Sequence, residues 1–197
     1  MSSPVETREN VMVRLVRRIE QAEALDRLDA VLGPVAQSIL RDPRRADLLR
    51  GTWFGHAIHP LLTDLPLGMW MSGTVLDLIG GPVDRPAARR LIGLGVLAAL
   101  PTAATGVAEW DGLRVRRDRR TGVLHAVLNS TALACYTSSW LARRRGRSGT
   151  AAALCGGVAA ILGGYLGGHL TEARNVSSRH PAFAADDGAF PAGMPPR

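Results

Sequence analysis

Residues 148–171 read SGTAAALCGGVAAILGGYLGGHLT, a run of 24 residues without one charged side chain. A helix that crosses the roughly 30 Å hydrocarbon core of a membrane needs about 20 apolar residues, because each adds about 1.5 Å. Three more stretches are equally poor in charge: residues 91–108 and 121–142 carry none, and residues 51–83 carry only Asp64 and Asp77. The sequence therefore predicts four transmembrane helices, over residues 61–79, 91–107, 123–141 and 151–168.

The competing interpretation of these four windows is a soluble four-helix bundle. A soluble helix needs a polar face, on which charged residues recur every three or four positions. Windows with at most two charges do not provide such a face. The overall hydrophobic fraction of 46% is ordinary only because the charged ends of the chain dilute its middle. We therefore interpret the chain as an all-α, polytopic membrane protein, with a four-transmembrane-helix bundle in residues 51–170.

The basic residues of the chain lie beside the predicted spans. The formal net charge is +7 and all 24 basic residues are arginine, which would suit either nucleic acid or a membrane surface. The arginines cluster in the links between spans, as in positively charged loops, and no aromatic stacking platform accompanies them. The lipid bilayer is therefore the predicted partner, and nucleic acid is not. Eleven arginines flank the spans on the terminal side and seven on the other, which favours cytoplasmic termini.

Residues 1–50 differ from the rest of the chain, because apolar and charged residues alternate there at helical spacing. Apolar residues recur every three or four positions from Leu15 to Val35. This pattern predicts an amphipathic helix that ends near Gly33 and Pro34, followed by short helices over residues 34–41 and 45–49. Such a segment would lie on the membrane surface, pack on a partner or cap the bundle itself. Residues 171–197 are rich in Pro, Ala and Gly, which predicts an irregular or disordered tail.

Four of the five histidines are expected at one rim of the bundle. His56 and His59 precede the first span, His125 opens the third span, and His169 closes the fourth. The first and third spans begin on the terminal side of the membrane and the fourth ends there. The four imidazole rings are therefore predicted to gather at the same membrane face.

Residues near these histidines could support a bound group. Asn129 shares a helix face with His125. Asp64 lies about one turn inside the first span, where a carboxylate is costly unless it is paired or hydrated. Two pairs of glycines in the fourth span would let a backbone or a flat cofactor approach closely: Gly163 with Gly167, and Gly164 with Gly168.

Imidazole side chains on different helices suggest two kinds of cofactor. His125 and His169 could ligate the iron of haem b from its two faces, with His56 and His59 as alternates or as a second pair. Three histidines with Asp or Glu could instead hold a non-haem metal such as Zn or Fe. The remaining alternative is that the rim histidines only hydrogen-bond helix ends and headgroups. The sequence predicts no catalytic residue.

The order of several motifs resembles the DUF2231 family of bacterial integral membrane proteins. Residues 51–70 read GTWFGHAIHPLLTDLPLGMW and are followed by Leu76 and Asp77, which is similar to the family's GTWLGHPLHP…TDxPxGxW…LD opening. The likeness continues through GVAEW at 106–110, LHAVLN at 124–129 and LGGHL at 166–170. It covers roughly residues 48–181, and the four rim histidines match motif positions.

This resemblance implies a four-helix domain of the bacterial inner membrane, similar to the type often fused to a C-terminal Rieske [2Fe–2S] domain. The sequence departs from that type in two ways. Residues 171–176, TEARNV, lack the Gly-rich run expected after GGHL, and the Cys/His ligand pairs of a Rieske centre are absent. Any iron–sulfur centre is therefore expected on a separate, soluble partner protein.

Three functional hypotheses follow from these patterns. The leading one is a membrane redox module that transfers electrons through haem or metal held by the rim histidines. The alternative is a non-enzymatic membrane anchor or scaffold that docks a soluble partner through the arginine-rich rim and residues 8–32. A carrier or channel built around Asp64 and Asp77 is weaker, because neither a broken helix nor an inverted repeat is visible.

Overall fold

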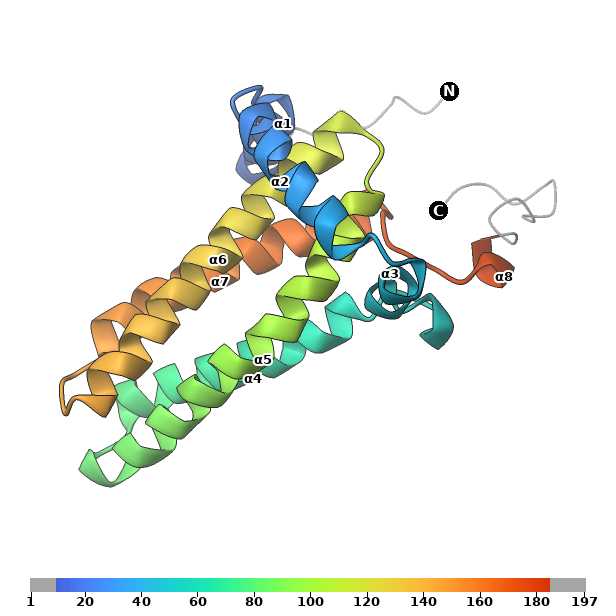
Figure 1. The fold of residues 1–197 in the computed structure, drawn as a ribbon. Coiled ribbons are helices and arrows are strands. Elements are labelled where there is room, and N and C mark those ends of the chain that lie inside the picture. The colour runs from blue at the N-terminus through green and yellow to red at the C-terminus, as the bar shows by residue number, and fades with distance from the viewer. Residues whose placement is uncertain (1–9, 185–197) are drawn as a thin grey trace, which may run out of the picture.

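The computed structural model describes residues 10–184, and within that range the chain is helical apart from short links and one isolated bridge. Four long helices form the core: α4 (His59–Ile79), α5 (Arg85–Gly112), α6 (Arg116–Arg144) and α7 (Thr150–Gly168). They lie side by side as two hairpins, α4 with α5 and α6 with α7 (Figure 1). The predicted all-α class is therefore confirmed.

Two of the four expected spans pass a test of length and composition for crossing a membrane. The two stretches are Pro82–Gly112 and Thr150–Ala173. The corresponding stretch of α4 contains two aspartates, and α6 begins and ends in arginines. Both α5 and α6 run beyond their expected bounds, because the arginines flanking each apolar window remain helical.

Three shorter helices cap one end of the core: α1 (Val11–Gln21), α2 (Leu25–Ile39) and α3 (Pro43–Arg50). The prediction of one amphipathic helix ending near Gly33 and Pro34 is wrong. The chain breaks instead at residues 22–24, and α2 continues through Pro34 to Ile39. Pro34 is exposed, so water can hydrogen-bond the backbone carbonyl that loses its helical partner to the proline.

The cap, defined as residues 11–50, packs on the chain's own core. Asp29 of α2 accepts a hydrogen bond of 2.8 Å from Arg119 of α6, and Asp26 accepts two from Arg120 at 2.7 and 2.8 Å. The charged face predicted from sequence is therefore engaged by arginines in the first two turns of α6. We call this the capped end of the core, and the end with the links at residues 80–84 and 145–149 the open end.

The chain returns to the capped end after α7. A short π-helical turn, His169–Ala173, follows α7, and a short helix α8 spans Pro181–Ala184. Between them the backbone pairs with residues 55–57, through a bridge of His56 with Arg179. Residues 185–197 of the expected irregular tail, and residues 1–9, lie outside the described residues.

Glycines on α5 and α7 let the large aromatic side chains of α4 and α6 approach the backbone. A Cβ atom added at Gly95 would lie 2.5 Å from the Trp70 ring, and one added at Gly156 would lie 2.8 Å from the Tyr136 ring. Trp70 and Tyr136 stack on each other, with centroids 4.6 Å apart and planes 10° apart. These contacts form the centre of the core.

The two hairpins repeat the same pattern of contacts. Each contacting residue of α6 lies 66 positions after its counterpart on α4, and the paired glycines of α7 lie 61 positions after those of α5. The counterparts touch each other, as expected when two repeats are related by a twofold axis. Three such pairs run from the capped end to the open end: His59 with His125, Trp70 with Tyr136, and Asp77 with Arg143.

Substitution of Gly156 by alanine tests the close packing of α6 on α7. The added methyl group would overlap the Tyr136 ring, which is held by its stack on Trp70, so we expect a loss of about 1–3 kcal/mol in unfolding free energy. Gly164 is a matched control on the same helix, because nothing lies within 4 Å of an added Cβ there. Gly164→Ala should be neutral or stabilise by up to about 1 kcal/mol. Denaturation followed by circular dichroism measures both, and equal effects would refute the packing argument.

Candidate functional site

Two histidines from different hairpins face each other near the capped end. His59 begins α4 and His125 lies in the third turn of α6. Their ring centroids are 6.2 Å apart and their planes are nearly perpendicular, at 83°. We call this arrangement the histidine pair. It occupies equivalent positions of the two repeats.

His59 is fixed by α5. Its Nδ1 lies 3.0 Å from the backbone carbonyl of Thr102 and 3.2 Å from Oγ1 of Thr105. Oγ1 of Thr102 lies 2.9 Å from the carbonyl of Ala98 in α5 and 3.1 Å from the carbonyl of Leu62 in α4, and its single proton is shared between these two acceptors. Pro66, four residues after Leu62, has no N–H to offer that carbonyl. The proline inside α4 thus leaves an acceptor that ties α5 to the histidine.

His125 is fixed in the same way by α7. Its Nδ1 lies 2.8 Å from the backbone carbonyl of Gly163. Asn129, one turn later, donates to the carbonyl of His125 at 2.8 Å and lies 3.3 Å from both ring nitrogens. Gly163 makes room for Asn129, since an added Cβ would lie 2.8 Å from its side-chain nitrogen. Similarly, Gly167 makes room for the His125 ring, at 2.9 Å.

These contacts determine which ring nitrogen of each histidine carries the proton, although Nε2 of His125 also has the amide nitrogen of Asn129 at 3.3 Å. A carbonyl oxygen only accepts hydrogen bonds, so Nδ1 of each ring must carry the proton. In the neutral form of each ring, Nε2 then holds the lone pair. Metal-ligating histidines have this arrangement, in which a backbone carbonyl fixes the tautomer and the ring orientation.

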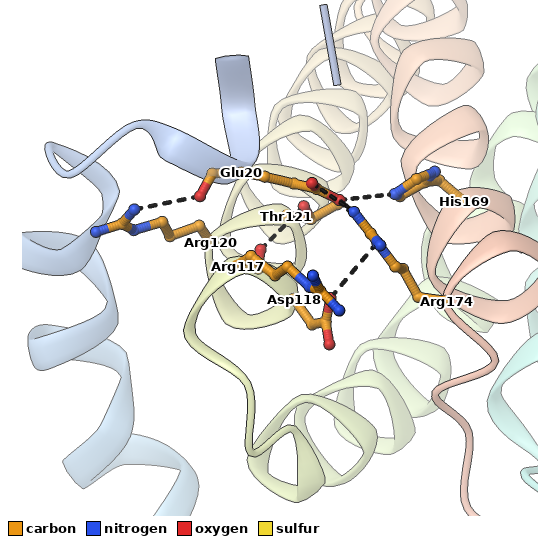
Figure 2. A network of polar contacts seen from close by, with 7 residues as sticks. All are labelled: Glu20, Arg117, Asp118, Arg120, Thr121, His169 and Arg174. Carbon is orange, nitrogen blue, oxygen red and sulfur yellow. Dashed lines mark hydrogen bonds and ion pairs between the residues drawn. The ribbon is translucent and has the colours of Figure 1, made fainter. Parts of the chain in front are cut away.

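The structure separates His169 from the histidine pair. Nε2 of His169 is 3.0 Å from a carboxylate oxygen of Glu20, and Arg174 donates to the same carboxylate from its Nε at 2.8 Å (Figure 2). The π-helical turn explains this convergence, because its i to i+5 hydrogen bond, Arg174 N to His169 O, aligns residues five apart. The sequence hypothesis paired His125 with His169, whereas the ring that faces His125 is that of His59.

The network around Glu20 locks the cap to the core. Arg174 also approaches Asp118 of α6 at 3.8 Å, and Arg120 donates to the backbone carbonyl of Glu20 at 3.2 Å (Figure 2). Burial alone would raise the pKa of Glu20, but the hydrogen bonds from Arg174 and His169 outweigh it and hold the pKa below its ordinary value. Glu20 is therefore a buried carboxylate stabilised by these two partners.

The other predicted site residues lie apart from the histidine pair. His56 is exposed, with its ring edge against Phe54 at a centroid distance of 5.2 Å. Asp64 is exposed on α4, and no hydrogen bond or ion pair joins it to the described part of the chain. Gly164 and Gly168 face open space, with nothing within 4 Å of an added Cβ. Of the four predicted glycines, only Gly163 and Gly167 lie beside the site.

The predicted site with three or more metal ligands is not formed in the region that the structure describes. Between residues 10 and 184, no three His, Cys, Asp or Glu side chains come together as a metal-binding group. The donor set at the histidine pair consists of two imidazoles. Two axial imidazoles complete the coordination of a haem iron, whereas a structural or catalytic zinc needs three or four protein ligands.

The open end carries a second polar pair on the repeat axis. Arg143 and Asp77 form a two-pronged ion pair, with Nη1 of Arg143 2.8 Å from Oδ1 of Asp77, and both side chains are more than nine-tenths buried. The sequence suggested Asp77 for a carrier or channel and predicted no role for Arg143. The missed signal was the repeat: His, an aromatic and a charge recur at spacings of 11 and 7 residues in both α4 and α6.

Comparison with known proteins gives one match. The sequence model of the DUF2231 family, described as "Predicted membrane protein", matches residues 55–179, which is more than half of the chain. The matched region includes both members of the histidine pair, both members of the Asp77–Arg143 pair and Arg174. No curated protein and no solved structure matches the chain.

Proposed function

The chain belongs to the DUF2231 family of predicted membrane proteins, and from this premise we propose that it is a four-span redox protein which binds haem between His59 and His125. The single observation that carries this proposal is the facing pair of imidazoles, each with Nδ1 bonded to a backbone carbonyl. The bound haem would supply one-electron transfer. The residues of the chain would ligate its iron, set the ring orientations and exclude water.

The symmetry of the site supports a ligand bound from two sides. The acceptor carbonyls of Thr102 and Gly163 occupy equivalent positions of the two hairpins, as do Gly106 and Gly167 beside the two rings. A planar haem presents its iron equally to a ligand on either face. Two imidazoles related by a twofold axis match that requirement, and a site for a metal ion with three unlike ligands would not be built this way.

The membrane placement of the proposal rests on the outward faces of all four long helices. Large apolar side chains are exposed on each of them, including Leu65, Leu97, Val127 and Ile161. Such contiguous apolar surface suits hydrocarbon rather than water. The buried charges of α4 and α6 near the open end neutralise each other as the Asp77–Arg143 pair, which a span requires. The exposed apolar faces, the neutralised ion pair and the excess of arginines on the terminal side together support multi-pass insertion in the inner membrane with cytoplasmic termini.

An absorption spectrum tests the proposal. The full chain should be expressed with iron and a haem precursor, and purified in mild detergent. We expect a Soret band in the wild-type protein, and its loss in His59→Ala and in His125→Ala, because either change removes one of two axial ligands. His56→Ala and His169→Ala are matched controls that remove an imidazole from the same end of the core.

The control variants separate this ligand pair from the pairing inferred from sequence. Retention of the Soret band in the two controls is expected, because His169 is engaged by Glu20 and His56 lies outside the pair. Loss of the band in His169→Ala but not in His59→Ala would instead support His125 and His169 as the ligand pair. A colourless preparation with a co-purifying soluble protein would favour the anchor or scaffold function instead.

A further inference from the structure

The open end of the core contains a cavity distinct from the histidine pair. Its volume is about 480 Å³, within the range of roughly 300–1,000 Å³ typical of small-molecule sites. It lies between the two links of the open end, and both hairpins contribute to its walls. The side chains that matter for its chemistry are Asp77, Arg85, Arg89, Arg143, Arg147 and Ser148.

The cavity is strongly positive because only one of its arginines is neutralised. Asp77, its one acidic residue, is fully engaged by Arg143 in the buried ion pair. Arg85, Arg89 and Arg147 make no side-chain hydrogen bond or ion pair with any residue that the structure describes. Arg85, Arg89 and Arg147 are exposed residues of the cavity lining, so three positive charges lie beside one site without an internal counter-ion.

The link at residues 145–149 packs closely against the end of α6. A Cβ atom added at Gly149, the residue before α7, would lie only 2.5 Å from the Ser139 carbonyl and 2.9 Å from Nε of Arg143, so a larger residue would push the link away from the ion pair. Gly146 has a φ of +71°, which turns the chain between Arg143 and Arg147. The hydroxyl of Ser148, also in the wall, lies 3.4 Å from both Oγ1 and the backbone nitrogen of Thr150 at the start of α7.

We propose that this cavity binds a phosphate group, held by Arg85, Arg89 and Arg147. Guanidinium groups match phosphate oxygens in planar, paired hydrogen bonds, and three of them offset the two negative charges of a phosphate monoester or the one of a diester. The group comes either from the headgroup of an anionic phospholipid or from a free phosphate-bearing solute. Both sources present the same chemistry to the cavity.

Two double variants with the same loss of charge test the site. In Arg89→Gln/Arg147→Gln, two lining arginines are removed, one from each hairpin. In the control Arg90→Gln/Arg145→Gln, the changes are at neighbours of those residues that do not line the cavity. The full chain, depleted of lipid in detergent, is titrated with inorganic phosphate at constant ionic strength. The same proteins are then placed in nanodiscs with or without phosphatidylglycerol, and retained lipid is measured by mass spectrometry.

We expect Arg89→Gln/Arg147→Gln to bind inorganic phosphate or phosphatidylglycerol at least about tenfold more weakly than the wild-type protein, since each lost guanidinium removes a charge-assisted hydrogen bond. The control should change affinity by less than about twofold, because exposed charges at a distance are screened by salt. If inorganic phosphate shows this difference, the source is a free solute; if only retained phosphatidylglycerol shows it, the source is a lipid headgroup. Equal losses in both variants, or no binding of either probe to the wild-type protein, would overturn the proposal.

Discussion

Asp77→Asn is expected to lower the free energy of unfolding by about 3–5 kcal/mol. The carboxylate of Asp77 is the counter-ion of Arg143, and both side chains are more than nine-tenths buried. Removing one partner leaves the other charge in the protein interior without compensation, which costs far more than the net value of the pair. Unfolding in a detergent mixture, followed by circular dichroism, measures the loss.

Asp64→Asn is the matched control for this change. Asp64 lies on the same helix but is exposed and makes no hydrogen bond or ion pair with the described residues, so its neutralisation should not lower the unfolding free energy by more than about 0.5 kcal/mol. The exchanged pair Asp77→Arg/Arg143→Asp should recover most of the lost stability, because the two positions are equivalent in the two repeats. An equal response of Asp77→Asn and Asp64→Asn would show that the ion pair does not hold the open end together.

Hydropathy could predict the helical class because each helix of the core must be apolar on most of its surface. The four charge-poor windows coincide with α4 to α7, and their centres are in the right places. The helix ends were less predictable, since the arginines of α5 and α6 continue the helix beyond the apolar window. The break at residues 22–24 was missed because the apolar spacing from Leu15 to Val35 runs across it without interruption.

The site was only partly predictable, for a reason that lies in tertiary contacts. The topology predicted that His56, His59, His125 and His169 share one membrane face, and this stays a prediction; the structure places His59 against His125 and His169 against Glu20. Which two rings face each other depends on packing between hairpins. Glu20, which engages His169, comes from a helix nearly 150 residues earlier in the chain. No local pattern in the sequence predicts the contact between Glu20 and His169.

The glycines illustrate the same limit. Small residues spaced four apart indicate that another group approaches the helix closely, but they do not identify that group. Gly163 and Gly167 pack against side chains of α6, while Gly164 and Gly168 face outward. The internal repeat was the stronger signal, because its spacing of 11 residues recurs in Gly95 and Gly106, and again in Gly156 and Gly167.

Glu20→Gln is expected to release the cap from the core, at a cost of about 2–3 kcal/mol. The carboxylate accepts hydrogen bonds from Arg174 and His169, and both donors stay partly buried after the change. An amide carries no charge, and its NH2 group replaces one carboxylate oxygen that accepts from Arg174 with a donor, so the ion pair with Arg174 is lost. Hydrogen exchange should therefore increase across α1, while α4 to α7 remain protected. Glu23→Gln, an exposed change just beyond α1, is the matched control.

The same contact should make the cap sensitive to acid. Because the pKa of Glu20 is held below its ordinary value of 4.5, its contribution to stability is complete above pH 4.5 and is lost as the pH falls through the lowered pKa. Exchange in α1 of the wild-type protein should thus rise only in that acidic range, towards the level of Glu20→Gln. The variant should show a smaller transition, because it has no carboxylate at position 20 to protonate and keeps only the acid-sensitive contact of Asp26, whose pKa is lowered by its hydrogen bonds from Arg120. A wild-type cap that opens with the same pH profile as Glu20→Gln would show that Glu20 is not the group that fastens it.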